Sequence, residues 1–259
     1  MGLDNMGARP KEQKPVPNPG MIVARNYQIV ELGTHLKTFP GKEPKEIALV
    51  QLGWELPGVQ HVFDENRGPQ PLAVFQEYTA SLDPKAKLAK DLKSWAGIAQ
   101  FSPETKLKQW LGQPCMINII HSLSKEPQLP VDKSIYKDGK MVYANVGSVV
   151  PLMEGVTCPP AINKPVYFDF DEFATIGAAN WNNYYMLPEW MQKKISEMLW
   201  VMINGKKYTW TDLITTCPML AKPESAQQSQ ASSGFGASPI PTATLSGTPS
   251  GQNSSIAPF

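Results

Sequence analysis

Three strand-like segments, a helical region and two more strand-like segments follow one another in the first 150 residues of this chain. The strand-like segments are rich in β-branched and aromatic residues, and Gly, Pro or Asp residues bound them. They span residues 21–32, 47–56, 72–80, 115–122 and 141–150. A sequence with this order of elements is expected to form a mainly β fold with one helical connection.

The helical connection is predicted over residues 83–97. Asp83 followed by Pro84 is a favourable helix start, because Asp is a good N-cap and Pro is tolerated in the first turn. A second, short helix is expected over residues 102–112. In the first helix, apolar Leu88, Leu92 and Trp95 share one face, and Lys87, Lys90 and Lys93 lie opposite as a solvated face.

This order of elements is that of the OB-fold, a five-stranded barrel whose strands and loops bind oligonucleotides. The sequence therefore predicts a five-stranded OB-fold barrel with a helical connection between strands 3 and 4. A five-stranded barrel of the same order without a ligand is the alternative.

The chain divides into four parts by composition. The predicted parts are a flexible basic arm (1–20), an OB-fold domain (21–155), a C-terminal extension packing on the barrel (156–220) and a disordered tail (221–259). From Ser225 onward the tail has no charged side chain, so it cannot bury enough apolar surface to offset the entropy of ordering.

The extension begins after a proline-rich segment. It contains an acidic and aromatic segment, residues 167–173, which is expected to pack across the barrel. A helix is predicted after Leu187-Pro188, with its apolar stripe formed by Trp190, Ile195 and Leu199. Asn204-Gly205 predicts a hairpin turn between two short strands.

Charge and composition limit the class of protein. The net charge of +1 provides no global basic field, so any nucleic-acid site must be a local patch. The three cysteines are widely spaced and no signal peptide is recognisable, which predicts a reducing, cytoplasmic location. No apolar run reaches the length of a membrane span, and no nucleophile-base pair, metal set or cofactor motif is present, so we expect no membrane, no enzyme, no metal and no cofactor.

Several segments resemble those of single-stranded DNA-binding proteins of tailed phages, a family with an OB-fold. The segments are 81–97, 111–118, 143–146, 151–165, 167–168 and 187–190. The resemblance covers about residues 20–200 and implies that this chain coats single-stranded DNA in phage replication or recombination, in the host cytoplasm.

Binding a single strand without reading its sequence needs aromatic rings for stacking and cations along the phosphates. The predicted single-stranded DNA site combines strand residues with lysines of the loops that join strands 1 and 2 and strands 4 and 5. Its members are Arg25, Tyr27, Lys37, Lys42, Lys45, Trp54, Tyr78, Lys125, Tyr136, Lys137, Lys140 and Tyr143. Each single ring could instead belong to the core, because a barrel of this size is filled by side chains.

The chain ends in Ile256-Ala257-Pro258-Phe259. This ending is similar to the Asp-Ile-Pro-Phe tip of bacterial single-stranded DNA-binding proteins, with Ile256, Pro258 and Phe259 matching. Residues 252–255 are uncharged, whereas the bacterial tails are acidic there. The resemblance implies that the tip recruits replication or recombination proteins.

The expected function is therefore to coat and protect single-stranded DNA, with partners brought in by the tail and a homo-oligomer as a further option. Two alternatives stay open. One is a phage interaction or virion-associated protein with an OB-like barrel that does not bind nucleic acid, and the other is a strand-annealing accessory protein.

Overall fold

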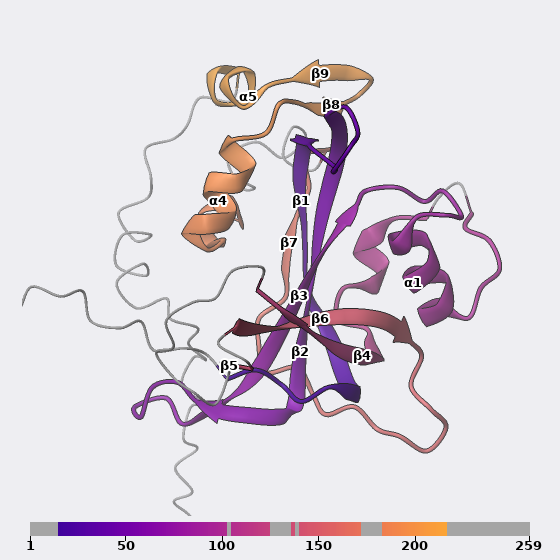
Figure 1. Ribbon diagram of the computed structural model, residues 1–259, viewed down its shortest axis with the longest axis vertical. Coiled ribbons are helices and arrows are strands. Elements are labelled where there is room, and N and C mark those ends of the chain that lie inside the picture. Colours follow the sequence, from indigo (N-terminus) through magenta and orange to yellow (C-terminus); the bar gives the residue numbers. More distant parts are fainter. Residues whose placement is uncertain (1–14, 103–104, 125–135, 138–139, 172–182, 217–259) are drawn as a thin grey trace, which may run out of the picture.

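The computed structural model describes residues 15–102, 105–124, 136–137, 140–171 and 183–216. Its strands are β1 (Gly20–Lys37), β2 (Lys45–Val62), β3 (Pro69–Thr79), β4 (Pro114–Leu123), β5 (Tyr136–Lys137), β6 (Lys140–Val150) and β7 (Val166–Phe168). They form one strongly curled sheet (Figure 1) in the order β3-β2-β1-β4-β6-β5. The ladders between these strands are antiparallel, while β7 pairs with β1 in parallel.

The helices are α1 (Lys87–Ala96), the 3-10 helix η1 (Leu107–Trp110), α4 (Glu189–Ser196) and α5 (Trp210–Thr216), and β8 (Val201–Ile203) pairs with β9 (Lys206–Tyr208). The predicted mainly β class is confirmed, as is the order of three strands, a helical connection and two strands. The Cα atoms of β3 and β6 come within 8 Å of each other, but no ladder joins these two strands in the described residues. The sheet is therefore curled and not closed by hydrogen bonds.

β1 and β2 are longer than predicted. β1 continues through Gly33, where its ladder with β2 shifts register and φ is 76°, the signature of a bulge that keeps the strand going. β2 continues past Pro57-Gly58, which was expected to be a turn. After an irregularity, pairing with β3 resumes at Gln60 and Pro71, so the predicted end of this strand was wrong.

α1 begins at Lys87, four residues after the predicted start at Asp83. The Asp83 carboxylate accepts a hydrogen bond from the Lys85 amide at 2.8 Å, so it caps a turn before the helix. The predicted apolar face is confirmed, since Leu88, Leu92 and Trp95 are buried, and Gly97 ends the helix in the left-handed region.

Two hydrophobic cores lie on opposite faces of the sheet. The inner core fills the curl and includes Trp54, Trp95 and Trp110. The outer core joins Val30, Leu32 and Leu49 of the sheet to the C-terminal extension. Figure 1 shows α1 and α4 on opposite sides of β1, β2 and β3. As a result every residue from Leu49 to Pro57 is buried, and β2 has no solvent-facing side along this stretch.

α4 packs on the sheet with a different stripe from the one predicted. Met191 and Ile195 are buried in the helix, with Met198 just after it, whereas Trp190 is 51% exposed and Leu199 is 40% exposed. Since Met191 and Met198 lie i−4 and i+3 from Ile195, they form the regular helical face that the predicted stripe did not. The hairpin at Asn204-Gly205 is confirmed.

The first residues described, from 15 onward, belong to the predicted basic arm. Pro17 is buried, and its carbonyl oxygen lies 2.8 Å from Nε2 of His121 on β4. The end of the arm therefore packs on the sheet. The rest of the arm, the last four residues of the predicted extension (217–220) and the predicted tail (221–259) lie outside the described residues.

Candidate nucleic-acid interface

The aromatic rings expected to stack with bases on β1, β2 and β3 are core residues. Trp54 is fully buried, and Tyr27 and Tyr78 are 3% exposed. The Trp54 ring meets Tyr78 edge-on with centroids 6.5 Å apart, and the Tyr78 hydroxyl donates a 2.9 Å hydrogen bond to Asp91. Burial and the Asp91 charge raise the pKa of Tyr78, so its hydroxyl stays protonated as a donor. The expectation that these three rings face a ligand is wrong, because the inner core encloses Trp54 and Tyr78, and Tyr27 packs edge-on against Phe75 of β3 with ring centroids 6.1 Å apart.

Among the predicted rings whose side chains the structure describes, Tyr143 is the one that remains accessible. It lies on β6 opposite Ser122 of β4, and it is 44% exposed. Lys140 begins the same strand and is half-buried. Tyr136 and Lys137 pair with β6 through the β5 backbone, but their side chains, like Lys125, lie outside the described part of the structure.

Two of the predicted cations make internal contacts. The Arg25 guanidinium donates to the carbonyl oxygens of Gly112 at 2.7 Å and Pro159 at 2.9 Å, so it ties two loops together. Lys37 forms an ion pair with Glu77. Both therefore make structural contacts within the protein, and their role as phosphate contacts stays a prediction.

Lys42 and Lys45, near the turn between β1 and β2, are exposed as predicted. Glu43 and Glu46 are exposed beside them, so the turn carries no local excess of positive charge. Glu46 also accepts a 3.0 Å hydrogen bond from the indole of Trp200, next to β8.

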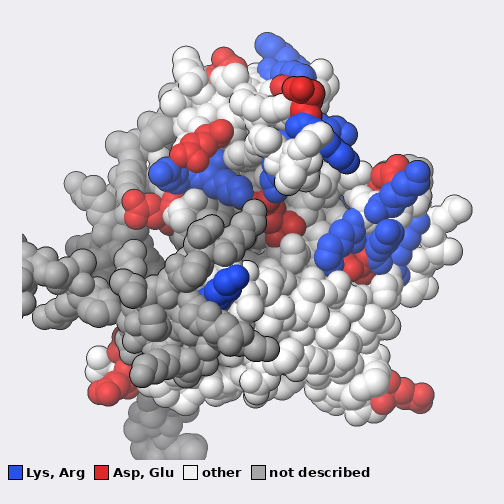
Figure 2. Space-filling model, viewed as in Figure 1, with Lys and Arg blue, Asp and Glu red and all other residues white. Residues whose placement is uncertain are grey.

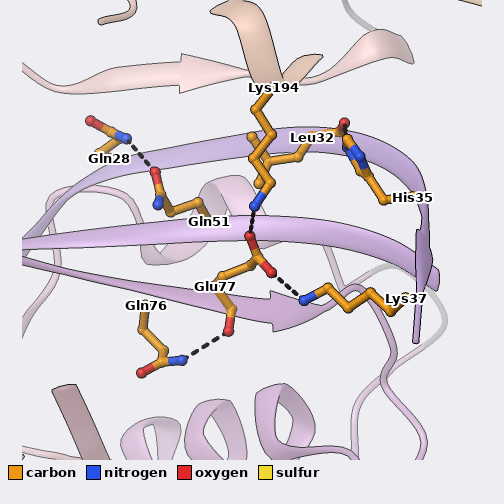
Figure 3. A network of polar contacts seen from close by, with 8 residues as sticks. All are labelled: Gln28, Leu32, His35, Lys37, Gln51, Gln76, Glu77 and Lys194. Carbon is orange, nitrogen blue, oxygen red and sulfur yellow. Dashed lines mark hydrogen bonds and ion pairs between the residues drawn. The ribbon is translucent and has the colours of Figure 1, made fainter. Parts of the chain in front are cut away.

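The outer face of β1, β2 and β3 is covered by the C-terminal extension. Figure 3 shows Glu77 of β3 between Lys37 and Lys194, the latter from α4. Burial raises the pKa of the Glu77 carboxyl, but hydrogen bonds from the two lysines outweigh it and the pKa is lowered. Beside this group, Gln28 donates to Gln51 at 3.4 Å. These side chains form a polar layer between the sheet and α4.

Two more carboxylates of the sheet hold the extension. Glu55 accepts hydrogen bonds from the amides of Ile162, at 3.1 Å, and Asn163, at 2.8 Å. Glu31 accepts the Phe170 amide at 3.0 Å. Burial raises the pKa of Glu31 to about 7, the Phe170 amide opposes this, and the charges of Asp169 and Asp171 add to it. The predicted acidic and aromatic segment therefore lies against β1, in part as strand β7.

A group of cations in the described residues lies where the sequence was expected to provide only a solvated helix face. We call this group the α1 lysine surface, and it consists of Lys85, Lys87, Lys90, Lys93, Lys106 and Lys108, of which all but half-buried Lys93 are exposed. Lys and Arg side chains gather over α1 at the right of Figure 2. Two carboxylates lie beside these lysines: Asp91 is buried and paired with Lys87 at 2.6 Å, and exposed Asp83 accepts a hydrogen bond from the Lys85 amide. The six lysines therefore still outnumber them.

The sequence did contain a signal for this surface. The six lysines fall between positions 85 and 108 of a chain whose net charge is only +1. Helical periodicity assigned Lys90 and Lys106 to two different predicted helices. It gave no information on how these helices are arranged relative to each other. The turn between the helices brings Phe101 against Trp110, with ring centroids 6.3 Å apart, and the Lys93 ammonium 5.4 Å above the Phe101 ring.

A pocket of about 380 Å³ opens where α1, η1, the start of β4 and the end of β6 meet. Its lining residues are Trp95, Ala96, Gln109, Trp110, Gln113, Pro114, Pro151 and Leu152. Most of its wall is apolar, and the two glutamines are exposed at the surface.

No group of three His, Cys, Asp or Glu residues that could hold a metal ion occurs within the described ranges. Cys115 is buried and Cys158 half-buried, and both are free thiols. No helix in the described residues is long and apolar enough to cross a membrane.

Comparison of the chain with protein-family models, with curated proteins and with solved structures finds no match. The resemblance to phage single-stranded DNA-binding proteins therefore stays a prediction from the sequence motifs.

Proposed function

We propose that this protein binds single-stranded DNA through an OB-type barrel and coats it during phage DNA replication or recombination in the host cytoplasm. An OB-fold is a five-stranded and partly open barrel. The curled sheet, the order of its strands and the position of α1 against β3 and β6 support this assignment.

The observation that carries the proposal is the course of β6. This strand bears exposed Tyr143 near one end, and the Lys87 ammonium donates a 3.0 Å hydrogen bond to the Gly147 carbonyl farther along it. The two residues are four positions apart on the strand, which corresponds to about 13 Å. A stacking ring and a lysine surface thus lie along one strand, which is the combination that sequence-independent binding of single strands requires.

This interface does not include the outer face of β1, β2 and β3, because the C-terminal extension packs there. In its place we propose a track from Lys140 and Tyr143 along β6 to the α1 lysine surface. Lys42 and Lys45, near the β1–β2 turn, are additional candidates for contacts with the DNA phosphates.

The experiment is the affinity for fluorescent oligo-dT across a salt series, with duplex DNA of equal length as competitor. For single strands, the slope of log affinity against log salt is about −0.7 per phosphate neutralised. Lys90→Glu and Lys106→Glu should each reduce the steepness of this slope. Lys193→Glu is the matched control, because Lys193 is exposed on α4, on the other side of the strands.

A wild-type protein with no salt-dependent affinity for oligo-dT would show that the proposed function is wrong. Equal effects of Lys193→Glu and Lys90→Glu would retain DNA binding but reject the α1 lysine surface as its site.

The tail is part of the same proposal. Ile256, Pro258 and Phe259 lie outside the described residues, and we propose that this tip recruits replication or recombination proteins while the folded part holds DNA.

Two observations favour a second function. The C-terminal extension covers the sheet face on which OB-folds hold oligonucleotides, and Tyr27, Trp54 and Tyr78 are buried. Both features suit a phage interaction or virion-associated protein that retained the barrel without nucleic-acid binding. The salt series separates the two functions.

A further inference from the structure

The pocket beside α1 has the chemistry of a site for a flat polar ring. Trp95 and Trp110 line it while each is less than 10% exposed, so their positions are set by the inner core. The Trp95 indole donates a 2.9 Å hydrogen bond to the Pro114 carbonyl, which holds that ring in place. The apolar wall is therefore preformed.

Two amides supply polar groups at this pocket. Gln109 and Gln113 are exposed lining residues, and each side chain offers both a donor and an acceptor. Amide side chains can pair with the edges of nucleobases, which likewise present donors and acceptors in one plane. An aliphatic ligand would use the wall but not these amides.

The charge beside the pocket is positive. Lys93 is three residues before Ala96 on α1, so the two side chains are neighbours on the helix surface. Lys93 also lies over the Phe101 ring, which packs edge-on against Trp110 of the pocket wall. The α1 lysine surface thus reaches the pocket, and the ligand that fits both is a flat ring attached to phosphates.

We propose that this pocket receives one base of the bound single strand, while the adjacent phosphates lie along the α1 lysine surface. This inference rests on the proposed function and specifies where a base is held. The pocket accounts for contacts that the β6 track does not provide, since that track has Tyr143 as its single exposed ring among the residues described on β6.

The test fills the pocket without changing charge. Ala96 is exposed and lines the pocket, so Ala96→Leu occupies space where the base would lie. Ser94→Leu is the matched control, because Ser94 is exposed on the same helix and points about 200° away. Affinity for oligo-dT is measured for both variants across the same salt series as the wild type.

We expect Ala96→Leu to weaken oligo-dT binding roughly 5- to 150-fold at every salt concentration, the range for one lost stacking contact. The salt slope should stay that of the wild type, because no phosphate contact is lost. Ser94→Leu should bind as the wild type does. A wild-type protein whose binding is salt-dependent, together with an Ala96→Leu variant of unchanged affinity, overturns the pocket and leaves the proposed function standing.

Two further measurements keep the result unambiguous. An oligonucleotide containing 5-iododeoxyuridine should photo-cross-link in the wild type to peptides that contain Trp95 or Trp110, and cross-links confined to other peptides overturn the inference even if Ala96→Leu fails to fold. In the second measurement, a peptide of residues 250–259 competes with oligo-dT, and its own binding to the wild type and to Ala96→Leu is measured. If Ala96→Leu abolishes binding of this peptide but not of oligo-dT, the occupant is a protein segment and the inference is wrong.

Discussion

Lys194 on α4 forms an ion pair with Glu77 on β3, and this contact ties the C-terminal extension to the outer face of the sheet. The other oxygen of the Glu77 carboxylate pairs with Lys37 of β1. One carboxylate therefore bridges two strands and a helix that is more than 100 residues away in sequence.

Removing this bridge should loosen the extension by a modest amount. Because the three side chains are partly exposed, we expect Lys194→Ala to lower the free energy of unfolding by about 0.5–1 kcal/mol, and Glu77→Gln by somewhat more. Urea unfolding measures both. Lys193→Ala is the control, since Lys193 is more exposed and lies 3.8 Å from Glu197. Equal effects at positions 193 and 194 would contradict a specific role for the bridge.

Gly33 tests the packing of the extension on β1. Its φ is 76°, and a Cβ atom there would overlap the Met198 sulfur, whereas Gly155 has a φ of 78° and open space around it. Both substitutions by Ala carry the left-handed backbone cost, about 1–2 kcal/mol. Gly33→Ala should cost roughly 1–3 kcal/mol more in unfolding free energy, because Met198 must move. Equal losses in the two variants would mean that Met198 does not pack on Gly33.

Glu31 should make stability fall as the pH rises toward neutral. The folded pKa of Glu31, about 7, is above its ordinary value of 4.5, so the folded protein holds a proton that the unfolded chain releases. Between about pH 5 and pH 7 this one group should remove up to roughly 3 kcal/mol of stability.

Glu31→Gln keeps an oxygen acceptor for the Phe170 amide but cannot ionise. Urea unfolding across this pH range should therefore show a flatter profile for the variant, and a more stable protein above neutral pH. A variant that follows the wild-type pH profile would show that Glu31 titrates normally.

Substitutions at Trp54 and Tyr143 should distinguish effects on stability from effects on DNA binding. Trp54→Ala removes a fully buried ring and should lower the unfolding free energy by about 3–5 kcal/mol. Tyr143→Ala removes an exposed ring and should change stability by less than about 0.5 kcal/mol. If β6 carries the DNA track, Tyr143→Ala weakens oligo-dT binding roughly 5-fold or more. Unchanged affinity would remove Tyr143 from the interface.

Deleting Ile256, Ala257, Pro258 and Phe259 should leave oligo-dT affinity and its salt slope unchanged, because the deleted residues carry no cationic side chain. Anisotropy measurements on the full chain and the deletion variant compare the two. A large loss of affinity in the deletion variant would contradict the separation of DNA binding from recruitment.

The elements of this protein follow from local sequence. Periodicity and turn residues predicted the five main strands, the apolar face of α1 and the hairpin at Asn204-Gly205, because each depends on neighbours within a few positions. The extensions of β1 and β2 were missed, since they depend on bulges and on pairing with a distant partner strand.

Which side chains face solvent was decided by the tertiary structure. β2 is buried on both faces, by the curl of the sheet on one side and by the extension on the other, so alternation along the strand could not separate Trp54 from a surface ring. In the same way, local pattern could not show that residues of α1 and η1 come together, as they do in the wall of one pocket. Local pattern determines the type of each element, whereas exposure depends on contacts between residues far apart in the chain.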